Sequence, residues 1–178
     1  MFECEFREAL PEEAQIISDL VNSAYRGDSS RLGWTTEADL LDGQRVDKEM
    51  ILEMLNEDES TILVACPVDE DEILGCVHLK KDGTNCLLGM LTTSPQMQKK
   101  GIGKQLLSEA EAFADFWDCQ KIQMKVISIR QELIAWYLKQ GFKLSPHKEA
   151  FPYGNERFGK PKRDDLEFAV LEKKLSFS

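Results

Sequence analysis

The chain has 178 residues, of which 42% are hydrophobic, and it carries a formal net charge of -10 at pH 7. This length and apolar content predict a single domain over residues 1–178 with a substantial hydrophobic core. The acidic excess repels phosphate backbones, so we expect no nucleic-acid partner, and cationic small molecules are favoured over anionic ones.

No apolar run of 18 residues occurs in the chain, and the N-terminal segment alternates apolar and acidic residues. We therefore expect a cytoplasmic protein that binds no membrane. The five cysteines form no C-x-x-C pair, and with two histidines no zinc spacing can be drawn. We expect reduced, buried cysteines and no metal.

The first elements in chain order are a strand and a helix. Phe2, Cys4 and Phe6 alternate with charged residues, which is the period of a half-buried strand. Pro11 suits a first helical turn, and apolar residues then repeat at helical spacing until about Tyr25. The sequence thus predicts an amphipathic helix after the strand.

The segment that follows this helix is polar. Residues 28–43 are rich in turn formers, and we predict a short helix there, capped by Thr35 or Thr36. Asp47 is placed to cap another helix over residues 48–55. Three strands are then predicted, joined by an acidic loop and by a D-G hairpin turn: residues 61–66, 73–79 and 86–92.

The second half of the chain alternates helical and strand periods. Apolar spacing predicts a helix from about residue 101 to 117, and another over residues 133–138 that Gly141 can end. Strands are predicted at residues 122–126 and in the tail, residues 164–175. The order of elements, with two strands after the last helix, implies an α/β fold with a mixed sheet flanked by helices.

Residues 98–104 read QKKGIGK and lie between a strand and a helix. At a helix start, unpaired backbone N–H groups and the helix dipole attract anions, and glycines let a phosphate approach the backbone. The run is not a P-loop, because Gln105 follows Lys104, and it lacks the third glycine of a dinucleotide motif, because Leu106 stands there. A phosphate or pyrophosphate ligand is predicted; the alternative is a helix start with solvated lysines.

The flanks of this run favour the ligand site. From Leu91 to Leu107 the sequence LTTSPQMQKKGIGKQLL resembles the acetyl-CoA signature of the GCN5-related N-acetyltransferase (GNAT) superfamily, Q/R-x-x-G-x-G/A after a strand and a proline. Farther on, Tyr137, Gly141 and Phe142 resemble the family's helix that ends in Y-x-x-x-G-F. The two motifs have the order and spacing of the family, and the resemblance covers about residues 2–175.

The resemblance implies the acyl-CoA N-acyltransferase fold, with a mostly antiparallel central sheet, and transfer of an acetyl group from acetyl-CoA to an amine. The amine would belong to a small molecule or peptide and would attack directly in a ternary complex. Backbone groups of Leu91, Thr92 and Thr93 would bind the pantetheine arm and the thioester carbonyl. The pyrophosphate would be held along Gln98, Lys99, Lys100, Gly101, Ile102, Gly103 and Lys104.

Two further residues take roles from the resemblance. Tyr137 stands where the family keeps the hydroxyl that protonates the departing thiolate, and the alternative is a tyrosine of the core. Arg130 stands where many members have asparagine. It either contacts the cofactor or is an ordinary solvated residue.

The general base is not apparent. Some family members carry glutamate or histidine on the strand before the loop, but residues 87–90 are Leu, Leu, Gly and Met. His78, expected on the neighbouring strand, is more typical of a packed or surface residue. We therefore expect proton removal through ordered water, helped by an acidic pocket.

In this fold the segment between the first two helices overhangs the thioester, so it is the predicted acceptor site. Its candidate residues are Tyr25, Trp34, Thr35, Glu37 and Arg45. Trp34 can instead anchor the loop, and Glu37 can be a first-turn acid of a helix. The aromatic segment of residues 147–165 is predicted to form the opposite wall, with a homodimer contact as the alternative.

Two functions other than catalysis stay open on the sequence alone. The missing strand base suggests a non-catalytic module that binds or senses acyl-CoA. The other is a structural or interaction domain in which the glycine-lysine loop is incidental.

Overall fold

The structure is a computed structural model that describes residues 3–26, 30–31, 36–155, 157 and 159–175. Its first half contains β1 (Cys4–Glu8), the 3-10 helix η1 (Pro11–Glu13), α1 (Ala14–Tyr25), β2 (Leu41–Asp42), α2 (Lys48–Asn56), β3 (Ser60–Pro67), β4 (Gly75–Asp82) and β5 (Asn85–Thr93). Its second half contains the 3-10 helix η3 (Pro95–Met97), α3 (Ile102–Phe116), β6 (Lys121–Ile127), α4 (Gln131–Lys139), β7 (Lys143–Ala150), β8 (Lys160–Pro161) and β9 (Glu167–Lys174).

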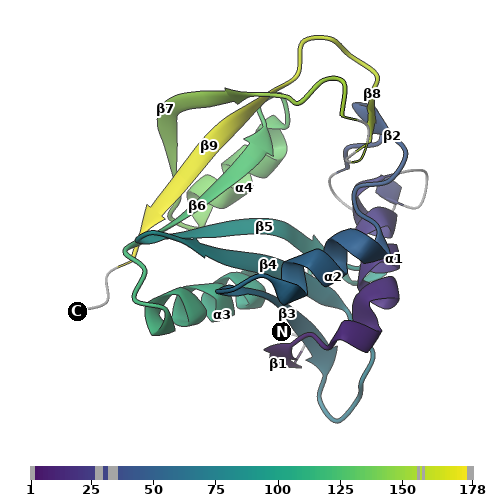
Figure 1. Ribbon diagram of the computed structural model, residues 1–178, viewed down its shortest axis with the longest axis vertical. Helices are drawn as coiled ribbons and strands as arrows, with labels where there is room; N and C mark the ends of the chain where they lie inside the picture. The colour runs from purple at the N-terminus through teal and green to yellow at the C-terminus, as the bar shows by residue number, and fades with distance from the viewer. Residues whose placement is uncertain (1–2, 27–29, 32–35, 156, 158, 176–178) are drawn as a thin grey trace.

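Seven strands form one sheet in the order β1-β3-β4-β5-β6-β9-β7, and β2 pairs with β8 in a separate ribbon. Neighbours in the large sheet run antiparallel, except that β5 and β6 are parallel. The predicted mixed, mostly antiparallel sheet flanked by helices is therefore confirmed (Figure 1).

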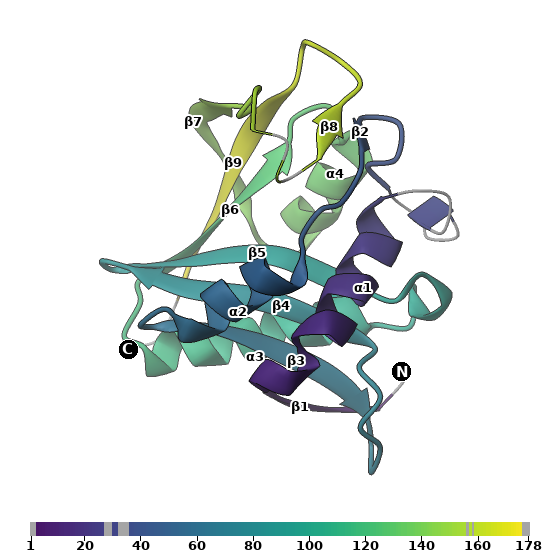
Figure 2. The same cartoon turned by 45° about the vertical axis from the view of Figure 1, so that its right-hand side comes forward.

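Helices cover both faces of the sheet, so a central strand such as β3 buries side chains on both of its faces. Ile62 and Val64 pack in the cluster with α1 and α2, whereas Leu63 and Ala65 pack in the cluster with α3. All four side chains are buried, so β3 is a continuous apolar run instead of an alternating one. Figure 2 shows α1 and α2 in front of the sheet and α3 behind it.

The ends of two helices follow from local chemistry, as predicted. Asp47 caps α2, because its Oδ1 accepts a hydrogen bond of 2.8 Å from the N–H of Met50. Gly141 follows α4 with a φ of 97°, a left-handed conformation that glycine adopts without strain. α4 therefore ends where the sequence placed its end.

The short helix predicted to follow a cap at Thr35 or Thr36 is wrong for residues 36–43. Residues 37–40 form a turn, in which Thr36 Oγ1 accepts a hydrogen bond of 3.0 Å from the N–H of Ala38. This is the bond that a cap residue makes, but only a turn follows it. The chain then enters β2, which pairs with β8. Thr35, the other expected cap, lies outside the described residues.

The separation of β5 from β6 positions the site. The two strands pair only over residues 85–87 and 121–123, and beyond these pairs they diverge (Figure 1). The edge of β5 that faces β6 therefore has no strand partner among the described residues from Leu88 onward. Its backbone N–H and C=O groups are available to a ligand, except for the carbonyl of Leu91, which accepts a hydrogen bond from Tyr25 Oη.

On its other edge β5 pairs with β4, and a β-bulge in this pairing changes the direction of the side chains of β5. Where β4 contributes Val77 alone, β5 contributes two residues, Met90 and Leu91, and Met90 has a φ of 58°. Leu88 packs on the α3 side of the sheet and Met90 on the α1 and α2 side, although residues two apart share a face in a regular strand. The bulge thus turns the end of β5 toward the site.

Within the described residues, no helix combines the length and apolar content of a membrane-spanning segment. Cys66, Cys76, Cys86 and Cys119 are buried free thiols, as expected, and Cys4 is partly buried. The described part of the chain holds no group of three His, Cys, Asp or Glu side chains arranged for a metal ion.

Candidate active site

Two hollows of about 430 Å³ each lie beside the divergence of β5 from β6, a volume suited to small molecules. The first, called the inner pocket, is lined by Tyr25, Arg26, Glu37, Leu41, Arg45, residues 87–91, residues 123–127, Arg130, Leu133, Tyr137, Phe151, Pro152 and Phe168. The second, called the loop groove, is lined by Ala24, Tyr25, residues 91–93, Gln98, Lys99, residues 101–104, Arg130, Leu133, Trp136, Tyr137 and Gln140.

The two hollows meet, because they share five lining residues: Tyr25, Leu91, Arg130, Leu133 and Tyr137. These residues come from the end of α1, the bulged end of β5 and the first turns of α4. A ligand in the loop groove and another in the inner pocket would therefore lie next to each other at this junction.

The loop groove presents the start of α3 to its ligand. No side chain caps this helix, and the first helical bond runs from the N–H of Gln105 to the carbonyl of Gly101 at 3.1 Å. The N–H groups of residues 102–104 therefore have no partner within the helix, and the helix dipole attracts an anion there. Gly101 has a φ of 85°, which explains why the sequence needs glycine at this turn.

The structure brings nearly all of the residues predicted to bind acetyl-CoA to the loop groove. Leu91, Thr92 and Thr93 line it together with Gln98, Lys99, Gly101, Ile102, Gly103 and Lys104, whereas Lys100 is exposed and does not line it. A Cβ atom added to Gly103 would lie 3.7 Å from the Trp136 ring and from Thr93 Oγ1, so this glycine forms part of the groove wall. Leu133, Trp136 and Gln140 also line the groove, and the motif did not single them out.

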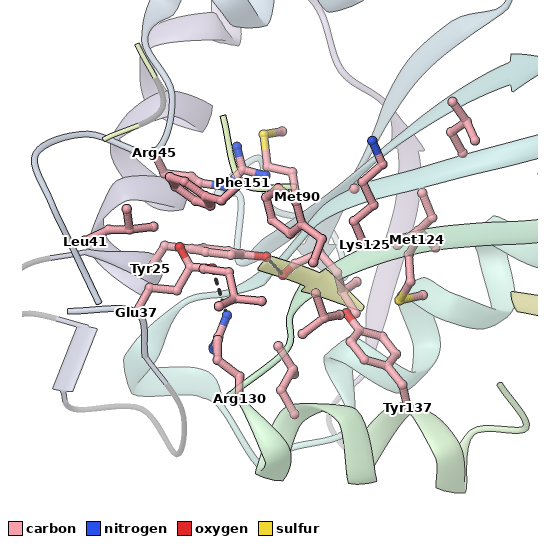
Figure 3. Close-up of a pocket in the computed structure, with 18 of the residues that line it drawn as sticks. Tyr25, Glu37, Leu41, Arg45, Met90, Met124, Lys125, Arg130, Tyr137 and Phe151 are labelled. Carbon is pink, nitrogen blue, oxygen red and sulfur yellow. Dashed lines mark hydrogen bonds and ion pairs between the residues drawn. The ribbon is translucent and has the colours of Figure 1, made fainter. Parts of the chain in front are cut away.

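Tyr137 lies at the junction of the two hollows, with its side chain directed from α4 toward the diverging strands (Figure 3). Its ring packs edge-on against Trp136 and Phe142, and the residue is only 5% exposed. Within the described part of the chain, the hydroxyl has no hydrogen-bond partner. Burial raises the pKa of this hydroxyl, with Arg130 opposing the rise, so it stays protonated at neutral pH.

Arg26, Glu37 and Arg130 form a buried ionic network at the back of the inner pocket. Glu37 Oε1 accepts from Arg26 Nε at 3.0 Å and from its Nη2 at 2.9 Å, while Oε2 accepts from Arg130 Nη1 at 3.0 Å. The three side chains are 5%, 8% and 6% exposed, respectively. Figure 3 shows the bond between Glu37 and Arg130.

This network corrects two alternatives. Arg130 is not a solvated residue, because it is buried and lines both hollows. Glu37 is not a first-turn helix acid, because it lies in a turn and binds two arginines. Arg26 was missed in the sequence, since nothing in one chain links it to a carboxylate eleven residues later or to Arg130.

Tyr25 and Arg45 stand on another side of the inner pocket (Figure 3). Tyr25 Oη donates a hydrogen bond of 2.8 Å to the carbonyl of Leu91, which ties the end of α1 to the bulge of β5. The Arg45 guanidinium carbon lies 5.5 Å from the centroid of the Tyr25 ring. Of the predicted acceptor residues, Tyr25, Glu37 and Arg45 thus share one pocket, while Trp34 and Thr35 lie outside the described residues.

The acidic pocket expected from the sequence is wrong for the described residues. Among these, Glu37 is the one carboxylate that lines the inner pocket, and it is already bound by two arginines. His78 lies elsewhere, with Nε2 2.9 Å from Ser60 Oγ, and burial lowers its pKa to about 4. Its imidazole is a neutral packing group, and the described carboxylates other than that of Glu37 lie outside the inner pocket.

The opposite wall of the inner pocket includes Phe151 and Pro152 from the segment predicted for that place. Phe151 packs with Leu41, Ile127 and Leu166 in a small cluster under the β2–β8 ribbon. The homodimer contact that was the alternative for this segment stays a prediction.

Comparisons with known proteins find similarity in sequence and in fold. A family model described as "Acetyltransferase (GNAT) family" matches residues 19–142. The chain is 30% identical over 77 residues to "Uncharacterized protein YdhI" of Bacillus subtilis (strain 168). These 77 residues cover 43% of this chain and 47% of that protein. The match therefore spans about half the length of this relative.

Two solved structures show the likeness of fold. Nourseothricin acetyltransferase superposes with a TM-score of 0.69 at 16% identity, covering 97% of this chain and 98% of that chain. A chain from Bacillus anthracis str. Ames, solved in complex with acetyl coenzyme A, gives a TM-score of 0.58 at 18% identity, covering 70% of this chain and 67% of that chain.

Proposed function

The chain belongs to the acetyltransferase (GNAT) family, and on this basis we propose that it moves an acetyl group from acetyl-CoA to the amine of a small molecule or peptide. The observation that carries the proposal is the meeting of the loop groove and the inner pocket at Tyr137. Two hollows that share one wall suit a ternary complex, in which the acceptor attacks the thioester directly.

The residues of the loop groove suit acetyl-CoA. The N–H groups of residues 102–104 have no partner within α3, and with Lys99 and Lys104 beside them they match a pyrophosphate in charge and in hydrogen-bonding capacity. The open edge of β5 offers backbone groups to an extended pantetheine arm. The acetyl-CoA found in the structurally similar Bacillus anthracis chain supports the same cosubstrate here.

The chemistry requires two proton movements. The amine nitrogen attacks the thioester carbonyl carbon, the C–N bond forms and the C–S bond breaks. Backbone N–H groups on the open edge of β5 would stabilise the oxyanion. Tyr137 would donate its proton to the departing sulfur, which its raised pKa permits. Water would take the amine proton, because no free carboxylate or histidine among the described residues lines the inner pocket.

That same missing base favours a second candidate function, a non-catalytic module that binds or senses acyl-CoA. Such a module would use the loop groove and would not need an acceptor. Catalysis is preferred because the inner pocket continues the groove beyond Tyr137 and has room for a second molecule.

Thermal unfolding and thiol release test the proposal together. Acetyl-CoA at about 100 times its dissociation constant should stabilise the protein by roughly 2.7 kcal/mol, with ADP as the control ligand. Amines should then release free thiol from acetyl-CoA. Stabilisation without thiol release across a broad amine panel would establish the sensing module, and the absence of stabilisation would contradict both functions.

A further inference from the structure

The charge of the inner pocket is opposite to that of the whole chain. The chain has a formal net charge of -10. The described residues that line the inner pocket nevertheless include four cations, Arg26, Arg45, Lys125 and Arg130, and a single carboxylate, that of Glu37. Like charges disfavour a polyamine in this position, whereas an anionic group on the acceptor would be attracted.

One of the four cations is available to a ligand. Arg26 and Arg130 are bound to Glu37, at 2.9 Å and 3.0 Å. Lys125 pairs with Glu149 at 2.5 Å on the outer rim, where both side chains are half exposed. For Arg45, by contrast, the described part of the chain contains no carboxylate within ion-pair distance.

Arg45 is also held in place. Its backbone N–H donates a hydrogen bond of 2.6 Å to Asn22 Oδ1, and its guanidinium lies over the Tyr25 ring at 5.5 Å. It is partly buried at the wall of the pocket, so a charged partner would be desolvated there. A planar guanidinium in this setting is suited to bidentate binding of a carboxylate.

Resting on the proposed function, we propose that the acceptor is an apolar amine that also bears a carboxylate, and that Arg45 binds this carboxylate. Most of the remaining pocket wall is apolar, including Leu41, Met90, Met124, Phe151 and Phe168. Tyr25 extends from Arg45 to the carbonyl of Leu91 (Figure 3). An acceptor that lies along Tyr25, with its acid group on Arg45, therefore directs its other end toward β5 and Tyr137.

The positive pocket also assists the reaction. Attack requires a neutral amine, and nearby positive charges together with an apolar wall lower the pKa of an ammonium group. The carboxylate on Arg45 retains the molecule while its amine gives up a proton. This arrangement reduces the demand for a strong base, which the described lining residues do not supply.

The test compares each acid with its amide. Leucine, methionine, phenylalanine and 4-aminobenzoate are measured against their primary amides, by thiol release and by calorimetric binding in the presence of coenzyme A. A charge-assisted bond predicts a preference of about tenfold or more for at least one acid over its amide. Arg45→Gln should reduce this ratio toward one, and Arg45→Lys should keep part of it.

Two controls make the result specific. Arg157→Gln removes an exposed arginine that pairs with Glu53, and it should leave the acid preference intact. Because Arg45 does not line the loop groove, stabilisation by acetyl-CoA should survive Arg45→Gln.

The outcomes separate this inference from the proposed function. Acids that bind through Arg45 without any thiol release would support the carboxylate site at Arg45 and refute the transferase, and with it the role of the acid as acceptor. Thiol release with amides or polyamines equal to or better than acids would support the transferase and overturn the inference. Binding of no panel acid in preference to its amide would overturn the inference as well.

Discussion

At the scale of single residues, the Tyr137 hydroxyl allows catalysis and stability to be measured apart. We expect Tyr137→Phe to lower kcat on the order of 10²-fold, the low end for a lost general acid, because a thiol with a pKa near 8.5 leaves fairly well unaided. The melting temperature should hardly change, since within the described residues the hydroxyl makes no hydrogen bond that could be lost. Steady-state kinetics and thermal unfolding on one preparation measure both effects.

Tyr153→Phe is the matched control for this substitution. Tyr153 Oη donates to the carbonyl of Arg163 and accepts from the N–H of Leu166, both at 2.9 Å, and it does not line either hollow. Its loss should cost about 1 kcal/mol of stability and no turnover. If Tyr137→Phe leaves turnover unchanged, as Tyr153→Phe should, then Tyr137 is a core residue and not the acid.

Glu37 is expected to contribute strongly to the stability of the folded protein, because it pairs with both Arg26 and Arg130. Glu37→Gln leaves Arg26 and Arg130 buried without a counter-charge, and breaking a buried pair in this way costs about 3–5 kcal/mol. Urea unfolding measures the loss. Asp39→Asn is the control, because Asp39 pairs with Arg31 at the exposed surface, where an ion pair contributes little to stability. Equal stability of the two variants would show that the network is not needed for folding.

His78 should make stability depend on pH between about 6.5 and 4. Burial lowers its folded-state pKa to about 4, whereas the unfolded-state pKa is about 6.5. Over this interval the unfolded chain binds a proton that the folded chain does not, so stability falls as pH falls. From pH 7.5 to pH 5 the expected loss is on the order of 1–2 kcal/mol, or several degrees of melting temperature. If the stability of a His78→Asn variant falls as steeply between pH 7.5 and pH 5, then groups other than His78 cause the pH dependence.

At the scale of elements, a substitution at Gly103 can block the access of a ligand to the start of α3 while the protein stays folded. Gly103 does not have a positive φ, and an added Cβ would meet Trp136 and Thr93 only at ordinary contact distance, 3.7 Å. Gly103→Ala should therefore fold normally and bind acetyl-CoA with little change. Gly103→Val should remain folded but lose about tenfold or more in affinity, because its methyl groups extend into the loop groove and hinder hydrogen bonds to a charged ligand. Calorimetric titration checks this, and normal binding by Gly103→Val would remove α3 from the site.

The elements that the sequence predicted well are those with local signals. α2 has its Asp47 cap, α3 has its glycines and apolar stripe, and α4 has Gly141 at its end. The helix prediction for residues 36–43 failed because β2, which ends this segment, pairs with β8, more than a hundred residues away. A two-residue strand is decided by that distant pairing, which no periodicity can show.

The same division holds for the candidate site. The loop of residues 98–104 and Tyr137 could be predicted, because each belongs to a contiguous motif. The ionic network could not, since Arg130 reaches Glu37 across 93 positions of the chain. The sequence signal that would have linked them is covariation, which one chain does not contain.

At the scale of the whole molecule, net charge is a poor guide to the charge of the inner pocket. The formal charge of -10 favoured a cationic acceptor, but the described acids lie almost entirely outside the inner pocket, and its wall is positive. An overall charge governs solubility and long-range encounter, while recognition depends on the few groups that are desolvated with the ligand.

The divergence of β5 from β6 also has a mechanical consequence. Seven residue pairs join β6 to β9, whereas three join β5 to β6. Backbone hydrogen bonds therefore resist hinge bending least along this line, and the softest motion of the sheet should rock one half against the other. A molecule bound to the backbone of β5 on one side and to α4 on the other would act as a brace across the hinge.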